Sequence, residues 1–301
     1  HQRVDVDFNG WFMCLIPTEV LAEIGLSLPL FIKWDDSEFG LRAKAAGYPT
    51  VTFPGAAVWH VPWSDKNDAL DWQSYFHQRN RFVAALLHSP FPHGGRMIRE
   101  SMNHQLKHLI SMQYSTVELR HQALEDVLAG PGALHGQLGT KLSEVRALAG
   151  EFGDAKLQPD PDAFPPVRLK KPRKHDRFDE VAGRASQLLS AATGSLRQLR
   201  TPRDLSRTNP ERIVAAMDAR WYRLATLDSA VVSMPDGTST AFYQRDPEQF
   251  RDLLRRTVEI HERLYREWPE LAKTYRARLG EITSPEAWEP TFASSTDGEG
   301  R

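Results

Sequence analysis

Residues 34–40 of this chain are Trp34-Asp35-Asp36-Ser37-Glu38-Phe39-Gly40, and they follow the apolar residues 30–32. The stretch places three carboxylates and an indole within five positions. A helix is expected from about 37 to 46, ending at Gly47, because glycine tolerates the left-handed backbone that closes a helix. A carboxylate at the end of a core strand in an α/β sheet lies where such sheets bind ligands. The stretch therefore predicts an α/β layer with a polar site.

Helix capping is the alternative explanation of these acids. Carboxylates at a helix start accept bonds from free N–H groups and complement the helix dipole without any ligand. One acid would meet that need, whereas three acids beside Trp34 exceed it. Grouped carboxylates in a cleft have displaced pKa values and perform acid–base chemistry, so we favour function over capping.

The first sixty residues alternate strand and helix patterns, which indicates an α/β layer. The predicted elements are a buried strand over 4–17, a helix over 20–24 capped by Thr18 and stopped by Gly25, and a strand over 50–53 and 56–59 that ends at His60.

Beyond residue 68 the pattern turns helical. Helices are predicted over 70–87, 96–128, 138–148, 179–199, 209–219 and 247–279, with a β-hairpin over 221–244 that turns at Pro235-Asp236-Gly237. The predicted divisions are an α/β portion over 1–92, a helical extension over 93–157, a proline-rich basic linker over 158–178, a helical domain with the hairpin over 179–293, and a disordered tail over 294–301.

Composition excludes several classes of protein. A net charge of −1 gives no reason to expect a nucleic-acid partner. The single cysteine, Cys14, excludes an internal disulfide framework and fits a reducing compartment. No apolar run approaches the roughly 20 residues that span a bilayer. Because the chain starts without Met inside an apparent strand, we expect it to be the back part of a larger protein.

Two further constellations carry polar chemistry. His60 lies between Trp59 and Trp63, although a hydrogen-bonded structural histidine is an equal alternative. On the helix that contains residues 72–81, His77 and Arg81 share one face. Such a cationic face suits a diphosphate, and a solvated helix face is the alternative.

Three motifs together resemble the inverting family-2 glycosyltransferases of GT-A fold. They are Phe31-Ile32-Lys33-Trp34-Asp35-Asp36-Ser37-Glu38-Phe39-Gly40-Leu41-Arg42, Ala57-Val58-Trp59-His60-Val61-Pro62-Trp63 and Tyr75-Phe76-His77-Gln78-Arg79-Asn80. More narrowly, they resemble the polymerising galactofuranosyltransferases of mycobacterial cell-wall galactan. The resemblance implies an α/β fold: the C-terminal half of a Rossmann-like GT-A domain, followed by a mainly α-helical region with a β-hairpin.

The resemblance also implies roles for individual residues. Asp36 would be the general base, and His60 would complete the shell of a Mn²⁺ or Mg²⁺ ion on the nucleotide diphosphate. The implied substrate-binding residues are Asp35, Glu38, Trp34, Trp11, His77 and Lys33. Where the family often has a second Trp after Trp11, this chain has Phe12, which loses the indole N–H.

The implied partners are a UDP-galactofuranose donor, a polyprenyl-linked galactan acceptor and further copies of the chain. The protein would be cytoplasmic and peripheral on the inner face of the plasma membrane. The basic run over 168–177 would lie on anionic lipid, and a solvated linker explains it equally well.

Asp5 and Asp7 form an Asp-x-Asp pair, but they alternate with apolar residues and are not expected to be the metal pair. The metal carboxylates are instead expected upstream of His1, so the chain alone is expected not to bind a UDP-sugar tightly and to be inactive. Two rivals stay open. One is a related transferase for another nucleotide sugar such as rhamnose, and the other is a non-catalytic helical scaffold.

Overall fold

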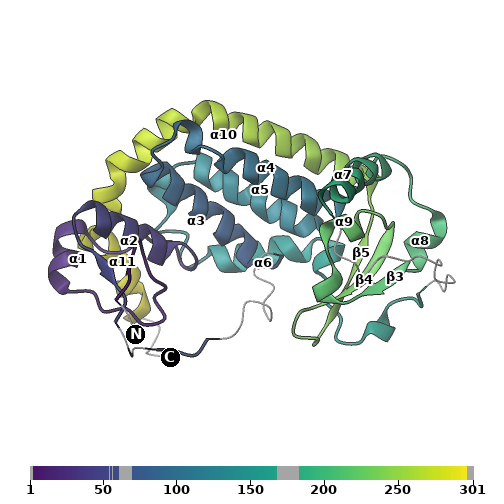
Figure 1. Ribbon diagram of the computed structural model, residues 1–301, viewed down its shortest axis with the longest axis horizontal. Helices are drawn as coiled ribbons and strands as arrows, with labels where there is room; N and C mark the ends of the chain where they lie inside the picture. The colour runs from purple at the N-terminus through teal and green to yellow at the C-terminus, as the bar shows by residue number, and fades with distance from the viewer. Residues whose placement is uncertain (1–2, 54, 56, 61–69, 168–182, 297–301) are drawn as a thin grey trace.

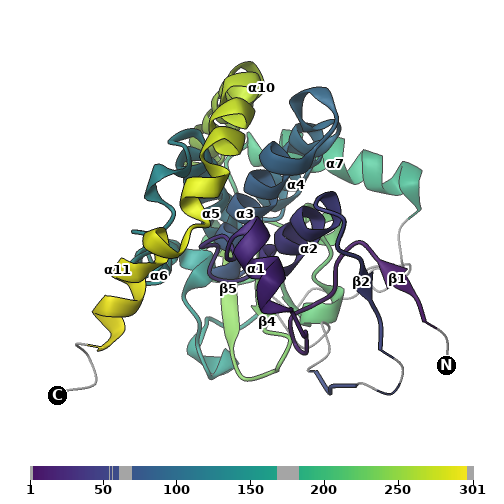
Figure 2. The same cartoon turned by 90° about the vertical axis from the view of Figure 1, so that its left-hand side faces the viewer.

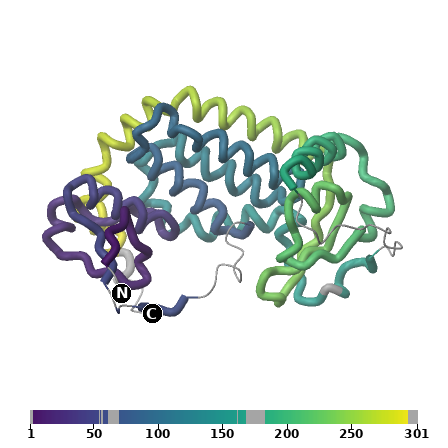
Figure 3. Tube along the Cα trace, in the orientation of Figure 1, coloured from purple at the N-terminus to yellow at the C-terminus, as the bar shows by residue number. Residues whose placement is uncertain are grey.

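The computed structural model describes residues 3–53, 55, 57–60, 70–167 and 183–296 (Figure 1). Three parts follow one another along the long axis: a small N-terminal lobe, a bundle of long helices, and a lobe that contains a three-stranded sheet (Figures 1 and 3). Trp63 and the basic run over 168–177 fall outside the described residues. The predicted domain divisions stay predictions. Among the described residues, no helix combines the length and apolar character that crossing a bilayer requires.

The N-terminal lobe packs two helices beside one short strand pair. Its elements are β1 (Asp5–Val6), α1 (Thr18–Ile24), α2 (Asp35–Ala45) and β2 (Thr50–Val51). Strands β1 and β2 are antiparallel, with Asp5 opposite Val51. Val20, Phe39 and Ala43 form the core of the lobe. The helix predicted from the acid cluster is confirmed as α2.

The buried strand predicted over 4–17 is wrong. Only Asp5–Val6 is strand, while Phe12, Met13 and Leu15 are exposed. An extended segment becomes a strand only where another strand takes up its backbone groups, and among the described residues β1 pairs with the two residues of β2. The strand predicted from 50 to 59 is likewise reduced to Thr50–Val51. Thr18 begins α1 instead of capping it, and Gly25 ends it as predicted.

Five helices form the central bundle. They are α3 (Gln73–His88), α4 (Met97–Ile110), α5 (Tyr114–Leu128), α6 (Lys141–Gly150) and the long α10 (Pro247–Ile282). α10 packs along α3, α4 and α5 (Figure 1), and Leu264 and Trp268 lie in the core that it shares with α3 and α5. The helix predicted over 247–279 is confirmed.

The single helix predicted over 96–128 is wrong, because it breaks into α4 and α5 at Met112, where φ is +63°. Side chains around the break replace the lost helical bonds. The Ser111 hydroxyl donates to the Lys107 carbonyl at 2.7 Å, and the Gln113 amide oxygen bonds His108 Nδ1 at 2.7 Å. The Ser111 hydroxyl thus competes for a carbonyl of the helix, while Gln113 bonds the His108 side chain across the turn.

The C-terminal lobe surrounds one small sheet. Its elements are α7 (Arg184–Gln198), α8 (Asp204–Thr208), β3 (Arg212–Val214), α9 (Trp221–Leu224), β4 (Ser229–Ser233) and β5 (Thr240–Gln244). The hairpin predicted over 221–244 is confirmed for β4 and β5, with Gly237 in the turn at φ +70°, but its first residues form helix α9 instead of strand. The helix predicted over 209–219 is wrong. Ile213 and Val214 instead pair in parallel with Val231 and Val232 and complete the sheet.

Residues after α10 attach the end of the chain to the N-terminal lobe. Helix α11 (Pro285–Thr296), which is not among the predicted elements, lies beside α1 (Figure 2). Trp288 Nε1 donates to the Ser27 carbonyl at 3.1 Å, and the Leu26 N–H donates to the Thr283 carbonyl at 2.8 Å. Short 3₁₀ turns join the other elements at Pro92–Gly94, Pro131–Ala133, Gly153–Ala155, Pro161–Ala163 and Ala216–Asp218.

Candidate functional site

The acid cluster is preceded by a strained loop. Phe31, Lys33 and Trp34 have φ values of +69°, +64° and +68°, in the left-handed region that non-glycine residues avoid. Each such residue costs about 1–2 kcal/mol, so the surrounding structure must hold the loop in place. Trp34 is also the N-cap residue, directly before the first residue of α2. The strain is therefore located directly before Asp35 and Asp36.

Asn80 of α3 holds this loop from the inside. Its side-chain Nδ2 lies 2.8 Å from the carbonyl oxygen of Leu30, 2.6 Å from that of Ile32 and 3.0 Å from that of Lys33. Asn80 is fully buried, so water does not compete for these carbonyls. Arg79 adds a bond from Nη2 to the Leu30 carbonyl at 3.3 Å. We call Arg79 and Asn80 the loop clamp.

The two aspartates occupy the first turn of α2. Asp36 is half-buried, and its Oδ1 accepts bonds from the backbone N–H and the hydroxyl of Ser37 at 2.6 and 3.2 Å. Burial raises the pKa of Asp35 above its ordinary value, and the charge of Asp36 adds to this rise, against backbone hydrogen bonds that lower it. The helix start therefore carries two neighbouring carboxyl groups that differ in environment.

Asp36 lines a hollow of about 670 Å³ together with Trp11. The apolar residues 11–17, the first half of α2 and residues 48–53 form most of its wall. Trp11 packs edge-on against Phe39, with ring centroids 5.4 Å apart. An aromatic wall facing a carboxylate suits a polar ring such as a sugar, because the ring packs on the indole while its hydroxyls bond the acid.

His60 adjoins this hollow through Phe12. The two ring centroids are 4.3 Å apart, and His60 is exposed. Within the described residues no group of three or more His, Cys, Asp or Glu side chains is arranged to hold a metal ion. One imidazole does not make a Mn²⁺ or Mg²⁺ site, so the described residues do not fit a complete metal shell.

The Asp-x-Asp pair is engaged elsewhere. Asp5 pairs with Arg3 at 2.8 Å, and Asp7 pairs with Lys44, all four side chains being largely exposed. Both acids thus have ordinary surface partners.

Glu38 lies in a different setting from the two aspartates. Its side chain is fully buried and accepts bonds from Arg42 Nε at 3.2 Å and Arg42 Nη2 at 3.1 Å, while His88 Nε2 lies 3.0 Å away. Arg42 in turn donates to the carbonyls of Ile24 and Leu26 at 2.6 and 2.9 Å. Glu38 thereby ties α2 to α3 and to the end of α1. Its binding of acceptor hydroxyls stays a prediction.

The structure brings Trp34, His77 and Lys33 together on the α3 side of the loop. The Trp34 and His77 rings meet edge-to-face, with centroids 5.9 Å apart. Burial, together with the positive charges of Arg120, Arg81, Lys33 and His104, lowers the pKa of His77 to about 4. His77 is therefore a neutral imidazole near pH 7. It offers one N–H donor and one acceptor in a positive field.

Sequence reasoning missed the loop clamp and the Arg42–His88 pair around Glu38. The i, i+4 spacing of Glu38 and Arg42 is a visible indication of an ion pair on one helix. No residue type marks the strained loop, because glycine, the usual occupant of positive φ, is absent from 31–34.

The chain is similar to known glycosyltransferases over most of its length. A family model described as glycosyltransferase like family 2 matches residues 1–85, and one described as galactofuranosyltransferase-2, domain 3 matches residues 97–294. The galactofuranosyltransferase GlfT2 of Mycolicibacterium smegmatis is 42% identical over 296 residues, which are 98% of this chain and 45% of that protein. The galactofuranosyltransferase GlfT2 of Mycobacterium tuberculosis is 38% identical over 302 residues, covering 99% of this chain and 47% of that protein.

This chain thus spans about half the length of the curated relatives that it matches. The match to the domain 3 model runs from the start of α4 into α11, and the match to the family-2 model includes the strained loop, the hollow and the loop clamp. Helices with two small sheets fit the α/β class of these glycosyltransferases. The chain belongs to the galactofuranosyltransferase-2 domain 3 family.

Proposed function

We propose that the protein transfers galactofuranose from UDP-galactofuranose to a lipid-linked galactan acceptor, with inversion at the anomeric carbon. The observation that carries the proposal is that Asp36 and Trp11 line one hollow. The names of the two relatives, both galactofuranosyltransferases, supply the sugar. In this proposal the described residues form the acceptor side of the site.

Asp36 acts as the general base in the proposed reaction. Its carboxylate takes the proton from an acceptor hydroxyl as that oxygen attacks the anomeric carbon of the donor. The new glycosidic C–O bond forms on the face opposite the leaving group, and the bond between the anomeric carbon and the phosphate oxygen breaks. UDP departs with that electron pair. Single displacement of this kind inverts the configuration.

The neighbouring residues orient the acceptor. Trp11 provides a face for one sugar ring, while Asp35 and the neutral His77 hold hydroxyl groups beside Trp34. The loop clamp supports this arrangement, because Asn80 bonds three carbonyls of the loop that leads into Asp36. Preorganised positioning is itself a large part of catalysis, since a misplacement of about 1 Å costs about a hundredfold in rate.

A divalent cation with His60 as one ligand, contact with an anionic membrane and self-association stay predictions from the resemblance. No step above depends on them. The donor also stays a proposal, and turnover of UDP-galactofuranose against a rhamnosyl nucleotide is the assay that separates the two donors.

The test compares Asp36→Asn with Asp5→Asn in the full-length protein. Both substitutions remove one negative charge, but Asp5 pairs with Arg3 at the surface. General-base catalysis contributes about 10²–10⁴-fold, so Asp36→Asn should lower kcat by about a thousandfold while UDP binding is retained. Asp5→Asn should leave kcat within about twofold of the wild type, because exposed ion pairs contribute little. Equal turnover by wild type and Asp36→Asn would refute the proposal.

A further inference from the structure

A second hollow, of about 570 Å³, lies in the C-terminal lobe, away from Asp36. It is formed where the end of α7, the segment 200–203, the loop before β4 and the end of β5 meet. Four of its lining residues are arginines, namely Arg197, Arg200, Arg203 and Arg245, and one is an acid, Asp228. We call it the arginine hollow.

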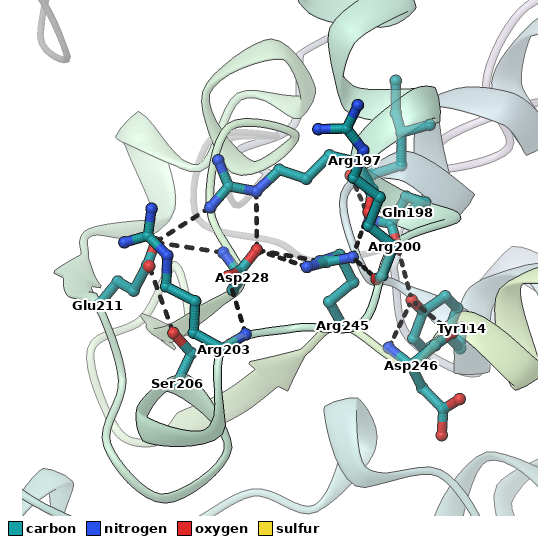
Figure 4. Close-up of polar contacts among 11 residues, drawn as sticks. Tyr114, Arg197, Gln198, Arg200, Arg203, Ser206, Glu211, Asp228, Arg245 and Asp246 are labelled. Atoms are coloured by element: carbon teal, nitrogen blue, oxygen red, sulfur yellow. Dashed lines mark hydrogen bonds and ion pairs between the residues drawn. The ribbon is translucent and has the colours of Figure 1, made fainter.

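The base of the arginine hollow is an internally matched set of charges (Figure 4). Asp228 Oδ1 accepts bonds from Arg197 Nε at 2.7 Å and from Arg245 Nε at 3.0 Å. The Asp228 and Arg245 side chains are almost fully buried, at 3% and 2% exposure. Burial alone would raise the pKa of Asp228, but the bond from Arg197 and the charges of Arg197 and Arg245 outweigh it and leave that pKa lowered.

Further bonds complete this base. Glu211 accepts the Asp228 backbone N–H at 3.2 Å and lies 3.8 Å from Arg197 Nη2. Arg245 also donates through Nη1 to the carbonyl of Arg197, in the last turn of α7, and to that of Arg200, just after the helix. Two carboxylates therefore face two guanidinium groups, and the base is close to neutral.

The positive charges of Arg200 and Arg203 are not neutralised by these two carboxylates. Both arginines are exposed at the mouth of the hollow, and among the described residues neither guanidinium group has a hydrogen-bond or ion-pair partner. Arg203 contributes only its backbone N–H to Asp228, at 3.4 Å. The mouth thus carries two unmatched positive charges. A ligand with a charge near −2 is complementary to it.

A phosphate group fits this mouth better than other anions of the same charge. The planar fork of each guanidinium binds phosphate oxygens in pairs, and a phosphomonoester carries a charge of about −1.5 to −2 near neutral pH. The exposed Thr201 hydroxyl lies between the two arginines in sequence and adds a donor. None of the lining residues is aromatic, so the hollow offers no surface on which a nucleobase stacks.

We propose that the arginine hollow binds the phosphate group of a phosphate or diphosphate ligand through Arg200 and Arg203. The ligand is either a free phosphate or a phosphate carried by a lipid. Leu196 lines the hollow and continues a stripe of exposed leucines on α7 that includes Leu188 and Leu189. An acyl chain attached to a bound phosphate would lie along this stripe.

The experiment titrates the chain with sodium pyrophosphate and with inorganic phosphate by calorimetry at low ionic strength. A second arm measures co-sedimentation with phosphatidylcholine vesicles that contain or lack phosphatidic acid. The test variant is Arg200→Gln/Arg203→Gln. The matched control is Arg96→Gln/Arg99→Gln, which removes the same charge from two exposed arginines near the start of α4.

Saturable binding that weakens at least tenfold in the test variant and stays within about twofold in the control supports the proposal. Binding of pyrophosphate identifies a free phosphate as the source, and binding only to vesicles with phosphatidic acid identifies a lipid. Binding in neither arm, or equal binding by test and control variants, overturns it. Thr201→Glu, which sets a negative charge at the mouth, provides a second variant and should also abolish binding.

Discussion

Arg79 Nε donates a hydrogen bond to Asn80 Oδ1 at 2.9 Å, and this bond orients the Asn80 amide. Because the amide oxygen is held by Arg79, the amide N–H₂ faces the carbonyls of the strained loop before α2. Arg79 is fixed in turn by Gln137, whose Oε1 accepts its Nη1 at 2.8 Å. The geometry of the acid cluster thus depends on two adjacent residues of α3.

Asn80→Ala should destabilise the protein by about 2–3 kcal/mol. The substitution leaves the half-buried carbonyls of Ile32 and Lys33 without this donor, while the Leu30 carbonyl keeps its bond from Arg79, and each unsatisfied buried group costs about 1–3 kcal/mol before local relaxation. Denaturant unfolding of the chain measures this loss. Asn103→Ala is the matched control, because Asn103 is exposed on α4 and should change the free energy of unfolding by less than about 0.5 kcal/mol. Equal effects of the two substitutions would show that the clamp does not hold the loop.

Glu38→Gln separates a structural from a substrate-binding role. If Glu38 serves to pair Arg42 and His88, the substitution leaves the buried Arg42 charge uncompensated and should cost about 3 kcal/mol of unfolding free energy. If Glu38 instead binds acceptor hydroxyls, KM for the acceptor should rise while the unfolding free energy hardly changes. We expect the first result.

Glu259→Gln provides the control for this comparison. Glu259 is an exposed residue of α10, 3.7 Å from Arg255. Exposed pairs of this kind contribute about 0–1 kcal/mol, so the same chemical change should be nearly silent there. A small effect at both positions would remove the structural role assigned to Glu38.

Elements with a clear helical period could be predicted from the sequence, and elements that depend on distant partners could not. α10 buries one face, at Phe250, Leu253, Thr257, Ile260, Leu264 and further positions of helical spacing, so that spacing is sufficient to predict it. The segment 4–17 is rich in apolar residues but pairs only at Asp5 and Val6, and 209–219 joins a sheet whose other strands come later in the chain. In both cases the partner strand, not local propensity, decides the structure.

The residue types of the candidate site could be predicted from the sequence, but the hydrogen bonds that hold its loop in place could not. The order of Asp35, Asp36 and Trp34 along the chain is enough to propose acid–base chemistry beside an aromatic ring. The three residues with positive φ before Asp35 have ordinary side chains. The hydrogen bonds that offset the conformational free energy of this backbone come from Asn80, nearly fifty residues away. A contact of that sequence separation leaves no periodic pattern in the sequence.

The free energy of unfolding should depend on pH because the burial of His77 lowers its pKa in the folded protein. In the unfolded chain His77 takes up a proton as the pH falls through about 6.5, whereas in the folded protein its pKa is about 4. Between these values the unfolded state binds more protons, so the free energy of unfolding falls as the pH drops from about 6.5 to about 4. The full contribution of one proton is a slope of about 1.4 kcal/mol per pH unit.

His77→Gln removes this titration and should flatten the slope within that window. Unfolding curves at several pH values for wild type and variant measure the difference. His108 and His261, whose pKa values burial lowers to about 3 and about 4, keep a residual slope in both proteins. Identical slopes in wild type and variant would mean that His77 is protonated to the same extent in folded and unfolded chains.

Gly40→Ala should weaken the protein although alanine is the better helix former. A Cβ built at Gly40 lies 2.4 Å from the Cβ of Phe8 and 2.9 Å from its Cα, so the methyl group displaces the backbone that follows β1. Overpacking of this kind costs about 1–3 kcal/mol and exceeds the gain of about 1 kcal/mol in helix propensity. Gly40 also lines the hollow that contains Asp36, so the displacement should raise KM for the acceptor.

Gly280→Ala in α10 is the matched control substitution, and it is expected to change the free energy of unfolding in the opposite direction. No atom lies within 4 Å of a Cβ built there, so only the propensity term acts, and stability should rise by about 0.5–1 kcal/mol. Thermal or denaturant unfolding of both variants makes the comparison. If Gly40→Ala stabilises the protein as Gly280→Ala does, then Phe8 does not pack on α2.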